Sequence, residues 1–242
     1  MELSVYESEH ENEASHWWFV VRREMFARLI QQRMDPAKCS FVDIGTSTGT
    51  NLRMLRDIRA TDVTGVELEM TAADFAYRKT GCKVIVADCT KIPLPDSSVD
   101  CVLATDVLEH VNDHAAAAKE IKRLLRPGGI AVVTVPAFMV LWGPQDELSH
   151  HKRRYRKSQI IELLHEADLK VEEAFYFNFL LLPPIFIARQ ILRHYKRNIR
   201  SEGDVNTRLI NALLLRIFRI DCWLAPRLRI PFGVSVCVIV RG

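Results

Sequence analysis

SFVDIGTSTG, residues 40–49, joins an apolar segment to two glycines four positions apart, at the point where a helix is expected to begin. A strand that ends in a glycine-containing turn lets a ligand lie against bare backbone. The helix that follows directs its unpaired N–H groups toward the same place. This stretch therefore predicts a strand–turn–helix unit of an α/β fold, with a ligand bound at the turn.

Glycine spacing and charge narrow the choice of ligand. The dinucleotide fingerprint G-x-G-x-x-G needs three glycines, whereas this turn has Gly45 and Gly49 and none at the helix-packing position. Asp43 lies two residues before Gly45, and its carboxylate would repel a pyrophosphate but attract a cation. S-adenosylmethionine carries a sulfonium and an ammonium and no phosphate. It therefore fits better than NAD, and an NAD-dependent oxidoreductase is disfavoured.

Further strand patterns follow at the spacing of an α/β fold. Glu67 ends the second strand about 20 residues beyond the glycine turn, where an acid holds the hydroxyls of a ribose. Asp88 ends the third and could accept a hydrogen bond from an adenine amino group. A Pro-Gly-Gly turn signal precedes the fifth. The four patterns span residues 62–68, 83–89, 99–105 and 130–137.

Five segments, in order and spacing, carry a resemblance: DIGTSTG, GVE, VADC, PLPDSSVDCVLATDVLEHV and LLRPGGIAVVTVP. Together they resemble the motifs of the class I S-adenosylmethionine-dependent methyltransferases, in the methyltransferase type 11 (UbiE-like) group. The resemblance covers residues 38–177, with a last strand at 234–241. It implies a Rossmann-like α/β fold with seven mostly parallel strands, helices on both faces and strand 7 antiparallel. It also implies S-adenosylmethionine as cofactor.

The resemblance assigns the cofactor-binding residues position by position. The loop residues frame the methionine end, Glu67 holds the ribose, and Leu68 lies beside the adenine. The remaining residues bracket the adenine edge or line the pocket beyond strand four. One departure is Ser47, which replaces the central loop glycine of the family. The full set is Asp43, Gly45, Thr46, Ser47, Gly49, Glu67, Leu68, Asp88, Cys89, Thr105 and Asp106.

Three parts are expected along the chain: a helical cap over residues 1–37, a core over 38–177 and 233–242, and an insertion over 178–232. The segment SHWWFVVRREMFARLI, residues 15–30, predicts an amphipathic helix in the cap. It resembles the leading segment of small-molecule and lipid-precursor methyltransferases, where a helix covers the cofactor and an arginine meets its carboxylate. Either Arg22 or Arg23 could take that role.

The insertion between strands six and seven is basic and apolar. Residues 1–177 carry 22 Lys+Arg and 27 Asp+Glu, a net of −5, whereas the last 65 carry 11 and 3, a net of +8. Helices are expected from about residue 184, turning basic over 189–200, and over 205–224. They form either a lid packed on the domain or a second subunit, or an interfacial pair on an anionic membrane. Nucleic acid is disfavoured because aromatic side chains are not interleaved with the basic ones.

The loop after strand five is expected to hold the acceptor, since ligands of open α/β sheets lie beyond the strand carboxyl ends. It resembles a bacterial subset with an LW…D…H-x-R-R-Y pattern. Its positive charge at a helix start is electrostatically unfavourable unless an anion is bound. Trp142, Arg153, Arg154 and Tyr155 are the predicted acceptor-binding residues, with the arginines as a clamp for phosphate or carboxylate.

A hydroxyl acceptor needs a base whose pKa lies near neutrality, and histidine fits. His151 is the predicted base, oriented by Asp146, and His110 in LEHV is the second candidate, although it is also part of the fold motif. No metal is expected, since the sequence has no helical pair of ligating histidines. The six cysteines show no C-x-x-C pair and are expected to be reduced.

We therefore expect a methyltransferase, with O-methylation of an amphipathic small molecule or a lipid-linked saccharide. The alternative is a binding module that keeps the cofactor fold without turnover. No secretory signal is visible at the acidic N-terminus. The expected location is cytoplasmic, with a peripheral contact on the inner membrane face. The oligomeric state stays open.

Overall fold

A single seven-stranded sheet lies at the centre of the computed structural model, which describes residues 12–195 and 207–242. The strand order is β3-β2-β1-β4-β5-β7-β6. β1 to β5 are parallel, and β7 runs antiparallel between β5 and β6. The predicted fold class is therefore confirmed, including the antiparallel β7. The strands are β1 Ser40–Ile44, β2 Asp62–Glu67, β3 Lys83–Val86, β4 Val99–Thr105, β5 Leu125–Pro136, β6 Lys170–Phe177 and β7 Ser235–Arg241.

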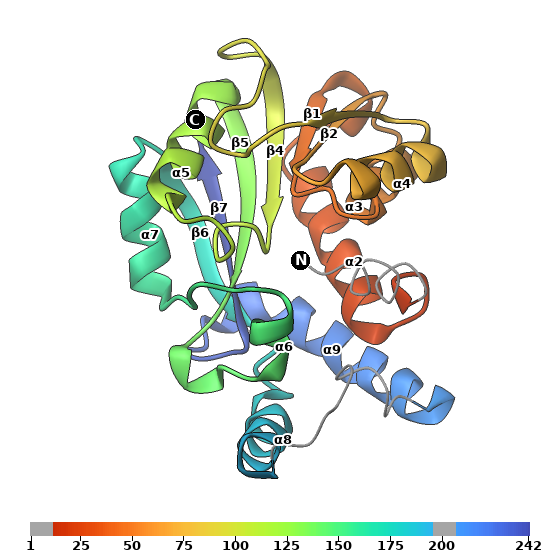
Figure 1. Cartoon of the computed structure of the whole chain (residues 1–242), viewed down its shortest axis with the longest axis vertical. Helices are drawn as coiled ribbons and strands as arrows, with labels where there is room; N and C mark the ends of the chain where they lie inside the picture. Colours follow the sequence, from red (N-terminus) through yellow and green to blue (C-terminus); the bar gives the residue numbers. More distant parts are fainter. Residues whose placement is uncertain (1–11, 196–206) are drawn as a thin grey trace.

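Helices cover both faces of the sheet (Figure 1). The central strands are buried on both sides, as their continuous apolar runs require. Two separate apolar clusters result, one on each face of the sheet. One face carries α2 Trp17–Gln31, α3 Thr50–Asp57 and α4 Met70–Thr80, and the other carries α5 His114–Leu124 and α7 Lys157–Glu166.

Two strand boundaries differ from the sequence prediction. β3 ends at Val86, so Asp88 and Cys89 lie in the turn that follows. β5 begins at Leu125, five residues earlier than expected, and includes the Pro-Gly-Gly turn signal. Leu125 pairs with Val99, and the register then shifts before the next pair. The extra residues bulge out of the ladder, which lets the strand continue through a sequence that normally ends one.

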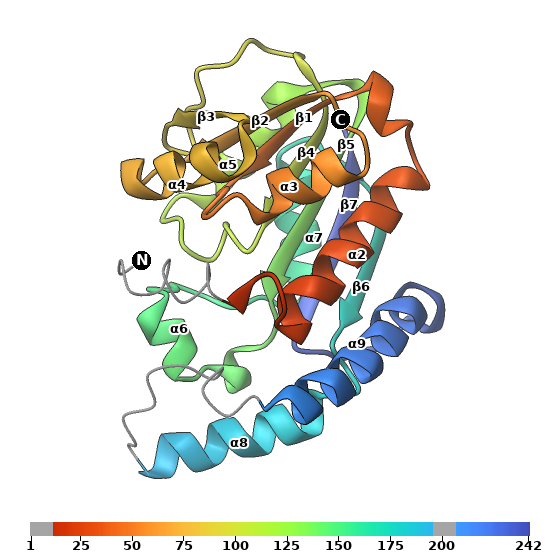
Figure 2. The ribbon, with the colours of Figure 1, turned by 90° about the vertical axis from the view of Figure 1, so that its right-hand side faces the viewer.

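The insertion contains two helices, α8 Leu182–Tyr195 and α9 Arg208–Leu228, at the end of the molecule toward which the parallel strands point (Figure 2). Pro183 and Pro184 lie in the first turn of α8, where proline is tolerated. The basic stretch expected over 189–200 lies partly outside the described residues. Within the described parts of the chain, no helix is both long and apolar enough to cross a membrane.

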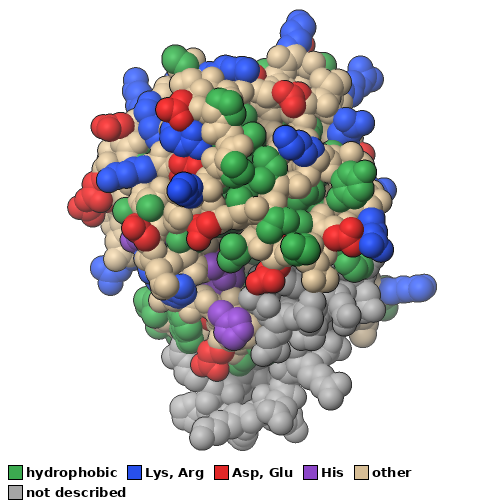
Figure 3. Space-filling model, turned by 45° about the horizontal axis from the view of Figure 1, so that its top comes forward, with side chains coloured by type: hydrophobic (Ala, Val, Ile, Leu, Met, Phe, Trp, Pro, Cys, Tyr) green, Lys and Arg blue, Asp and Glu red, His purple; other side chains and the backbone are tan. Residues whose placement is uncertain are grey.

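Charge is distributed differently over the core and over α9. On the face shown in Figure 3, acidic and basic side chains are interspersed among the described residues. By contrast, α9 carries four arginines and a single acidic residue, Asp221. Because Asp221 is buried, the exposed surface of α9 is basic.

The N-terminal helix and the insertion pack against each other rather than separately on the core. The ring of Phe218 on α9 stacks on Trp18 with centroids 5.3 Å apart and meets Trp17 edge-on at 5.2 Å. The side chain of Asn211 accepts a hydrogen bond from the Trp17 N–H and donates one to the Ser15 carbonyl. Segments about 200 residues apart in sequence thus form one helical unit beside the sheet.

A buried carboxylate fixes α9 to the end of β6. Asp221 is fully buried, and its two oxygens accept hydrogen bonds from the N–H groups of Asn178 (2.6 Å) and Leu180 (2.7 Å). Asn178 has a left-handed backbone with φ of 60°, so the chain turns sharply there. Burial raises the pKa of Asp221 to about 6, against the opposing effect of these hydrogen bonds.

We expect Asp221→Ala to lower the thermal midpoint of unfolding. The substitution leaves two backbone N–H groups without acceptors, at about 1–3 kcal/mol each. For a chain of this size each kcal/mol corresponds to roughly 2–4 °C. Asp221→Asn is the matched control, because it keeps one acceptor oxygen and should lose less. An Ala variant as stable as the unsubstituted protein would contradict this role.

Candidate functional site

The turn after β1 requires glycine at two positions. Gly45 has φ of +72°, and a Cβ there would lie 2.5 Å from Val107 Cγ2. Gly49 has φ of +84°, and its Cβ would lie 3.0 Å from the backbone of Ala76. A side chain at either position would therefore clash as well as strain the backbone. Thr46 Oγ1 closes the turn with a hydrogen bond to the Asp43 carbonyl at 2.8 Å.

Ser47, the departure from the family pattern, takes the left-handed conformation that a glycine would favour. Its φ is 47°, which costs about 1–2 kcal/mol for a residue with a side chain. Its N–H donates to Glu67 Oε2 at 2.8 Å. The other oxygen of Glu67 accepts from the N–H groups of Leu68 and Glu69. The loop after β1 and the end of β2 are therefore joined through this carboxylate.

Asp43 is fully buried at the end of β1. Asn51 donates to its Oδ1 at 3.0 Å and also to Thr105 Oγ1 at 2.9 Å. The second oxygen, Oδ2, has no hydrogen-bond partner among the described residues. Burial raises the pKa of Asp43 to about 7, against the opposing hydrogen bonds from Asn51 and Thr46. An unpartnered buried carboxylate is costly, and a bound cation would compensate it.

The two neighbouring arginines of α2, Arg22 and Arg23, have different surroundings in the structure. Arg22 is buried, and its Nη2 lies 2.5 Å from Asp106 Oδ2 and 3.1 Å from Thr134 Oγ1. Arg23 is half-buried, and its Nη1 is a buried donor with no acceptor within the described part of the chain. Arg22 therefore organises the end of β4, whereas Arg23 retains a donor that a ligand carboxylate could accept from. Which of them meets the cofactor stays a prediction.

The residues expected at the adenine end are more exposed to solvent than Asp43. Leu68 is 62% exposed, directly after Glu67. Asp88 is exposed, and Thr90 donates to it from both backbone and hydroxyl, which lowers its pKa. Burial raises the pKa of the Cys89 thiol to about 11, so this cysteine is uncharged at neutral pH. Leu68 and Asp88 are thus exposed to solvent, whereas Cys89 is half-buried.

The loop after β5, residues 138–158, is the segment expected to hold the acceptor and is called the acceptor loop below. It centres on a second buried carboxylate, Asp146 in α6 Pro144–Leu148. His151 Nδ1 lies 2.8 Å from its Oδ1. Arg154 binds both oxygens, at 2.7 and 2.9 Å, and the Gly143 N–H donates to Oδ2. Burial alone would raise the pKa of Asp146, but the hydrogen bonds of His151 and Arg154 outweigh it and lower the pKa to about 2. Asp146 is therefore ionised and orients His151.

Arg154, predicted as part of an arginine clamp for the acceptor, pairs with Asp146 in the structure, and its role toward an acceptor stays a prediction. Its guanidinium is buried against Asp146 and also donates to the Ala137 carbonyl, because a buried carboxylate needs a charged partner. Tyr155 is also buried, with its hydroxyl 2.8 Å from His114 Nδ1, so it belongs to the core. Arg153 and Trp142 are half-buried, and their acceptor-binding role stays a prediction.

His110, the second candidate base, lies beside His151, with ring centroids 4.6 Å apart. Burial and the neighbouring His151 lower the pKa of His110 to about 4, so its ring is neutral at physiological pH. Glu109, one residue earlier, is fully buried, and burial raises its pKa well above the usual range. The LEHV segment thus places a polar side chain beside His151 as well as contributing residues to the fold.

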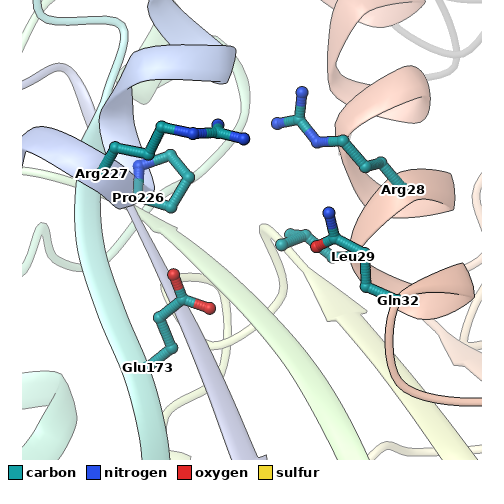
Figure 4. A pocket seen from close by; sticks show the side chains of 6 residues that line it. All are labelled: Arg28, Leu29, Gln32, Glu173, Pro226 and Arg227. Atoms are coloured by element: carbon teal, nitrogen blue, oxygen red, sulfur yellow. The ribbon is translucent and has the colours of Figure 1, made fainter.

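A shallow cavity lies away from this site, between α2, α9 and β6 (Figure 4). Arg28 and Arg227 face each other across it, and Glu173 lies below them. Its volume of about 230 Å³ is smaller than the roughly 300–1,000 Å³ of small-molecule sites. The chemistry-bearing side chains gather instead at the carboxyl ends of β1, β2 and β4.

Sequence reasoning missed several contributors to the site. Asn51 and Thr134 bridge predicted residues, but a single asparagine or threonine gives no signal in one sequence. Glu13 is buried and hydrogen-bonds the Thr48 hydroxyl at 2.5 Å, and it also contacts Thr50 and Lys79. It ties the segment before α2 to the start of α3, a link between distant positions that no local pattern reveals.

Comparison with known proteins agrees with this geometry. Residues 42–133 match a family model described as a methyltransferase domain. A Mycolicibacterium smegmatis protein named "Probable S-adenosylmethionine-dependent methyltransferase" is 29% identical over 65% of this chain and 61% of its own length. The chain thus spans less than two thirds of this relative.

Solved structures share the fold at low identity. A Thermotoga maritima S-adenosylmethionine-dependent methyltransferase has a TM-score of 0.63 at 17% identity, covering 99% of this chain and 95% of that one. The [4+2]-cyclase SpnF has a TM-score of 0.58 at 21% identity, covering 89% and 80%. Residues 42–133 thus carry a methyltransferase domain, and the chain as a whole has the fold of class I S-adenosylmethionine-dependent methyltransferases. Its site suits that cofactor, because the unpartnered oxygen of Asp43 needs a cationic neighbour. Glu67 accepts three backbone hydrogen bonds and keeps one lone pair for a hydroxyl donor.

We expect the affinity for S-adenosylmethionine to fall below pH 7, by about tenfold per pH unit. A protonated Asp43 must lose its proton before it can pair with the cationic ligand. Isothermal titration calorimetry between pH 6 and 8 measures this directly. Asp43→Asn should bind weakly at every pH and lose the dependence, and a pH-dependent Asn variant would contradict the assignment.

Asp43→Asn should weaken cofactor binding, but it should not destabilise the ligand-free protein above pH 7. The folded-state pKa of about 7 exceeds the usual 3.8, so the stability contributed by Asp43 is present at low pH and lost as pH rises through 7. Asp43→Asn removes that loss. Above pH 7 its thermal midpoint should therefore equal or exceed that of the unsubstituted protein, as differential scanning fluorimetry would show.

Proposed function

We propose that this chain transfers the methyl group of S-adenosylmethionine to a hydroxyl of an acceptor that carries an apolar part. The observation that carries the proposal is the His151–Asp146 pair, 2.8 Å apart in the loop after β5. When bound, the cofactor supplies a methyl group on a sulfonium, open to in-line displacement. The protein has to orient the acceptor, exclude water and accept one proton.

His151 is the proposed acceptor of that proton. Its Nδ1 is engaged by Asp146, so the proton lies on Nδ1 and the lone pair on Nε2. The acceptor oxygen forms a bond to the methyl carbon as the carbon–sulfur bond breaks, and the hydroxyl proton passes to Nε2. Because Asp146 stays ionised, it stabilises the imidazolium that results.

Exposed apolar side chains near the acceptor loop support an amphipathic acceptor. Met139 and Val140 follow β5 and are more than half exposed, and Ile187 on α8 is equally open. Arg189 on α8 donates to the Leu141 carbonyl at 2.5 Å, which holds α8 against this loop. An apolar chain extending from the acceptor hydroxyl could lie along these side chains.

The exposed side of α9 supports presentation of that acceptor at an anionic membrane. Leu209, Leu213, Ile220 and Trp223 point outward, at 85, 59, 55 and 50% exposure. They lie on the same side of the helix as Arg216 and Arg227, at positions three or four residues apart. Apolar side chains flanked by arginine and an exposed tryptophan are typical of interfacial helices. The opposite side of α9 packs on α2 and β6, so this helix need not leave the domain to bind lipid.

We expect His151→Ala to lower methyl transfer by about 10²–10⁴-fold, as for loss of a general base. Transfer of labelled methyl from S-adenosylmethionine into lipid and saccharide extracts is the assay. His150→Ala is the matched control, because His150 is the exposed neighbour and should retain full rate. An unchanged rate in His151→Ala would contradict the base assignment. Cofactor binding without transfer to any extract would favour the binding module.

We also expect the protein to bind vesicles that contain phosphatidylserine at low salt and to dissociate at high salt. Trp223→Glu should weaken binding about tenfold or more, because it removes an apolar ring that would be buried in the lipid and adds a negative charge. Tyr77→Glu on α4 is the control, since Tyr77 is similarly exposed on another surface. Equal binding by both variants, or none by the unsubstituted protein, in vesicle sedimentation would contradict the membrane part.

A further inference from the structure

Three side chains from two distant segments converge beside the acceptor loop. Glu109 and His110 follow β4, and His151 follows α6. One nitrogen of each imidazole and one carboxylate oxygen lie within 4.8 Å of one another. Two imidazoles and a carboxylate form a donor set that proteins use for zinc and for other divalent first-row transition metals.

Glu109 gives this cluster a buried carboxyl group without hydrogen-bond partners among the described residues. Its side chain is fully buried, and neither carboxylate oxygen has a hydrogen-bond partner among the residues that the structure describes. Buried polar atoms are normally paired, and leaving both oxygens unpaired is energetically costly. Neither the fold nor the proposed proton transfer uses this carboxylate. A bound metal ion, which accepts electron pairs from carboxylate oxygens, would account for the position of Glu109.

His151 is already held as metal-bound histidines are held. Its Nδ1 lies 2.8 Å from Asp146 Oδ1, and Asp146 is fixed in turn by Arg154 and by the Gly143 N–H. A carboxylate on one ring nitrogen fixes the tautomer and leaves the other nitrogen as a lone-pair donor. The adjacent ring of His110, 4.6 Å away between centroids, adds the second imidazole.

We propose that Glu109, His110 and His151 bind a divalent first-row transition-metal ion. Ligand atoms around a tetrahedral zinc lie about 3.4 Å apart, so the three ligand atoms, which now lie within 4.8 Å of one another, would approach by up to about 1.4 Å on binding. Three protein ligands leave a fourth position open, as in catalytic rather than structural sites. Hard cations such as Mg²⁺ are disfavoured, because they prefer oxygen ligands and near-octahedral geometry.

The proposed ion would act on the acceptor, and this role rests on the proposed O-methylation. An acceptor hydroxyl at the open position would have its pKa lowered by the cation. Its proton would then pass to solvent rather than to His151, whose lone pair binds the metal. His151 is needed both as a proton acceptor without the metal and as a ligand with it, so loss of activity in a His151 variant does not distinguish these two roles. Metal binding, measured without an acceptor, does.

The test is titration of the full-length, tag-free, chelator-treated protein with Zn²⁺ by calorimetry and with Co²⁺ by visible absorption. We expect one equivalent of each to bind, with Co²⁺ d–d bands of a four- or five-coordinate site, and no comparable binding of Mg²⁺. Glu109→Gln, which keeps side-chain size, and His151→Ala should each weaken binding by at least tenfold. His150→Ala should bind as the unsubstituted protein does, because His150 is exposed next to the cluster.

Titration of each variant with S-adenosylmethionine serves as the test of folding, since the cluster lies outside the expected cofactor residues. No Zn²⁺ or Co²⁺ binding by a protein that still binds the cofactor would overturn the metal site and leave the proposed methyl transfer intact. Stoichiometric binding that Glu109→Gln and His151→Ala leave unchanged would also overturn it. Failure to bind S-adenosylmethionine would instead overturn the proposed function.

Discussion

Burial of the Asp43 carboxylate at the end of β1 is the constraint around which the cofactor side is arranged. Gly45 lies against Val107 with no room for a Cβ, so the chain turns tightly and Asp43 cannot swing into solvent. Asn51 satisfies one oxygen and also holds Thr105 on the neighbouring strand. The other oxygen remains for a cation. The ligand-free protein therefore keeps a destabilising feature that the ligand relieves, as expected of a functional site.

Two buried carboxylates in the same molecule have opposite protonation behaviour. Asp43 has neutral partners, and burial raises its pKa to about 7. Asp146 is equally buried, but Arg154 and His151 lower its pKa to about 2. The difference comes from the partners and not from burial. Asp43 therefore has an oxygen available for a cationic ligand. Asp146 is already paired with the guanidinium of Arg154 and orients His151.

The parts predictable from the sequence are those encoded locally. Strand–turn–helix units, the acid that ends β2 and proline in a first helical turn need only neighbouring residues, and the structure reproduces them. Asp88, by contrast, lies two residues beyond the end of β3. The role of Arg154 could not be read this way. Its position beside Arg153 suggested an anion clamp, but the acceptor loop folds back so that Arg154 reaches Asp146, eight residues earlier. Likewise, no metal was expected because the histidines lack helical spacing, whereas His110 and His151 meet only through the fold.

Contacts between distant segments also position α2, α8 and α9, the helices added to the core, which matter for acceptor specificity. Within this fold, the core places the cofactor residues at strand ends, and loops and added helices shape the acceptor site. Here α2 and α9 pack through Trp17, Trp18 and Phe218, while Arg189 fixes α8 to the acceptor loop. A surface contact on α8 or α9 is thus joined through packed side chains to both the cofactor side and the acceptor side. Through these contacts α9 packs on the helix that carries Arg22 and Arg23, and α8 packs on the loop that carries His151.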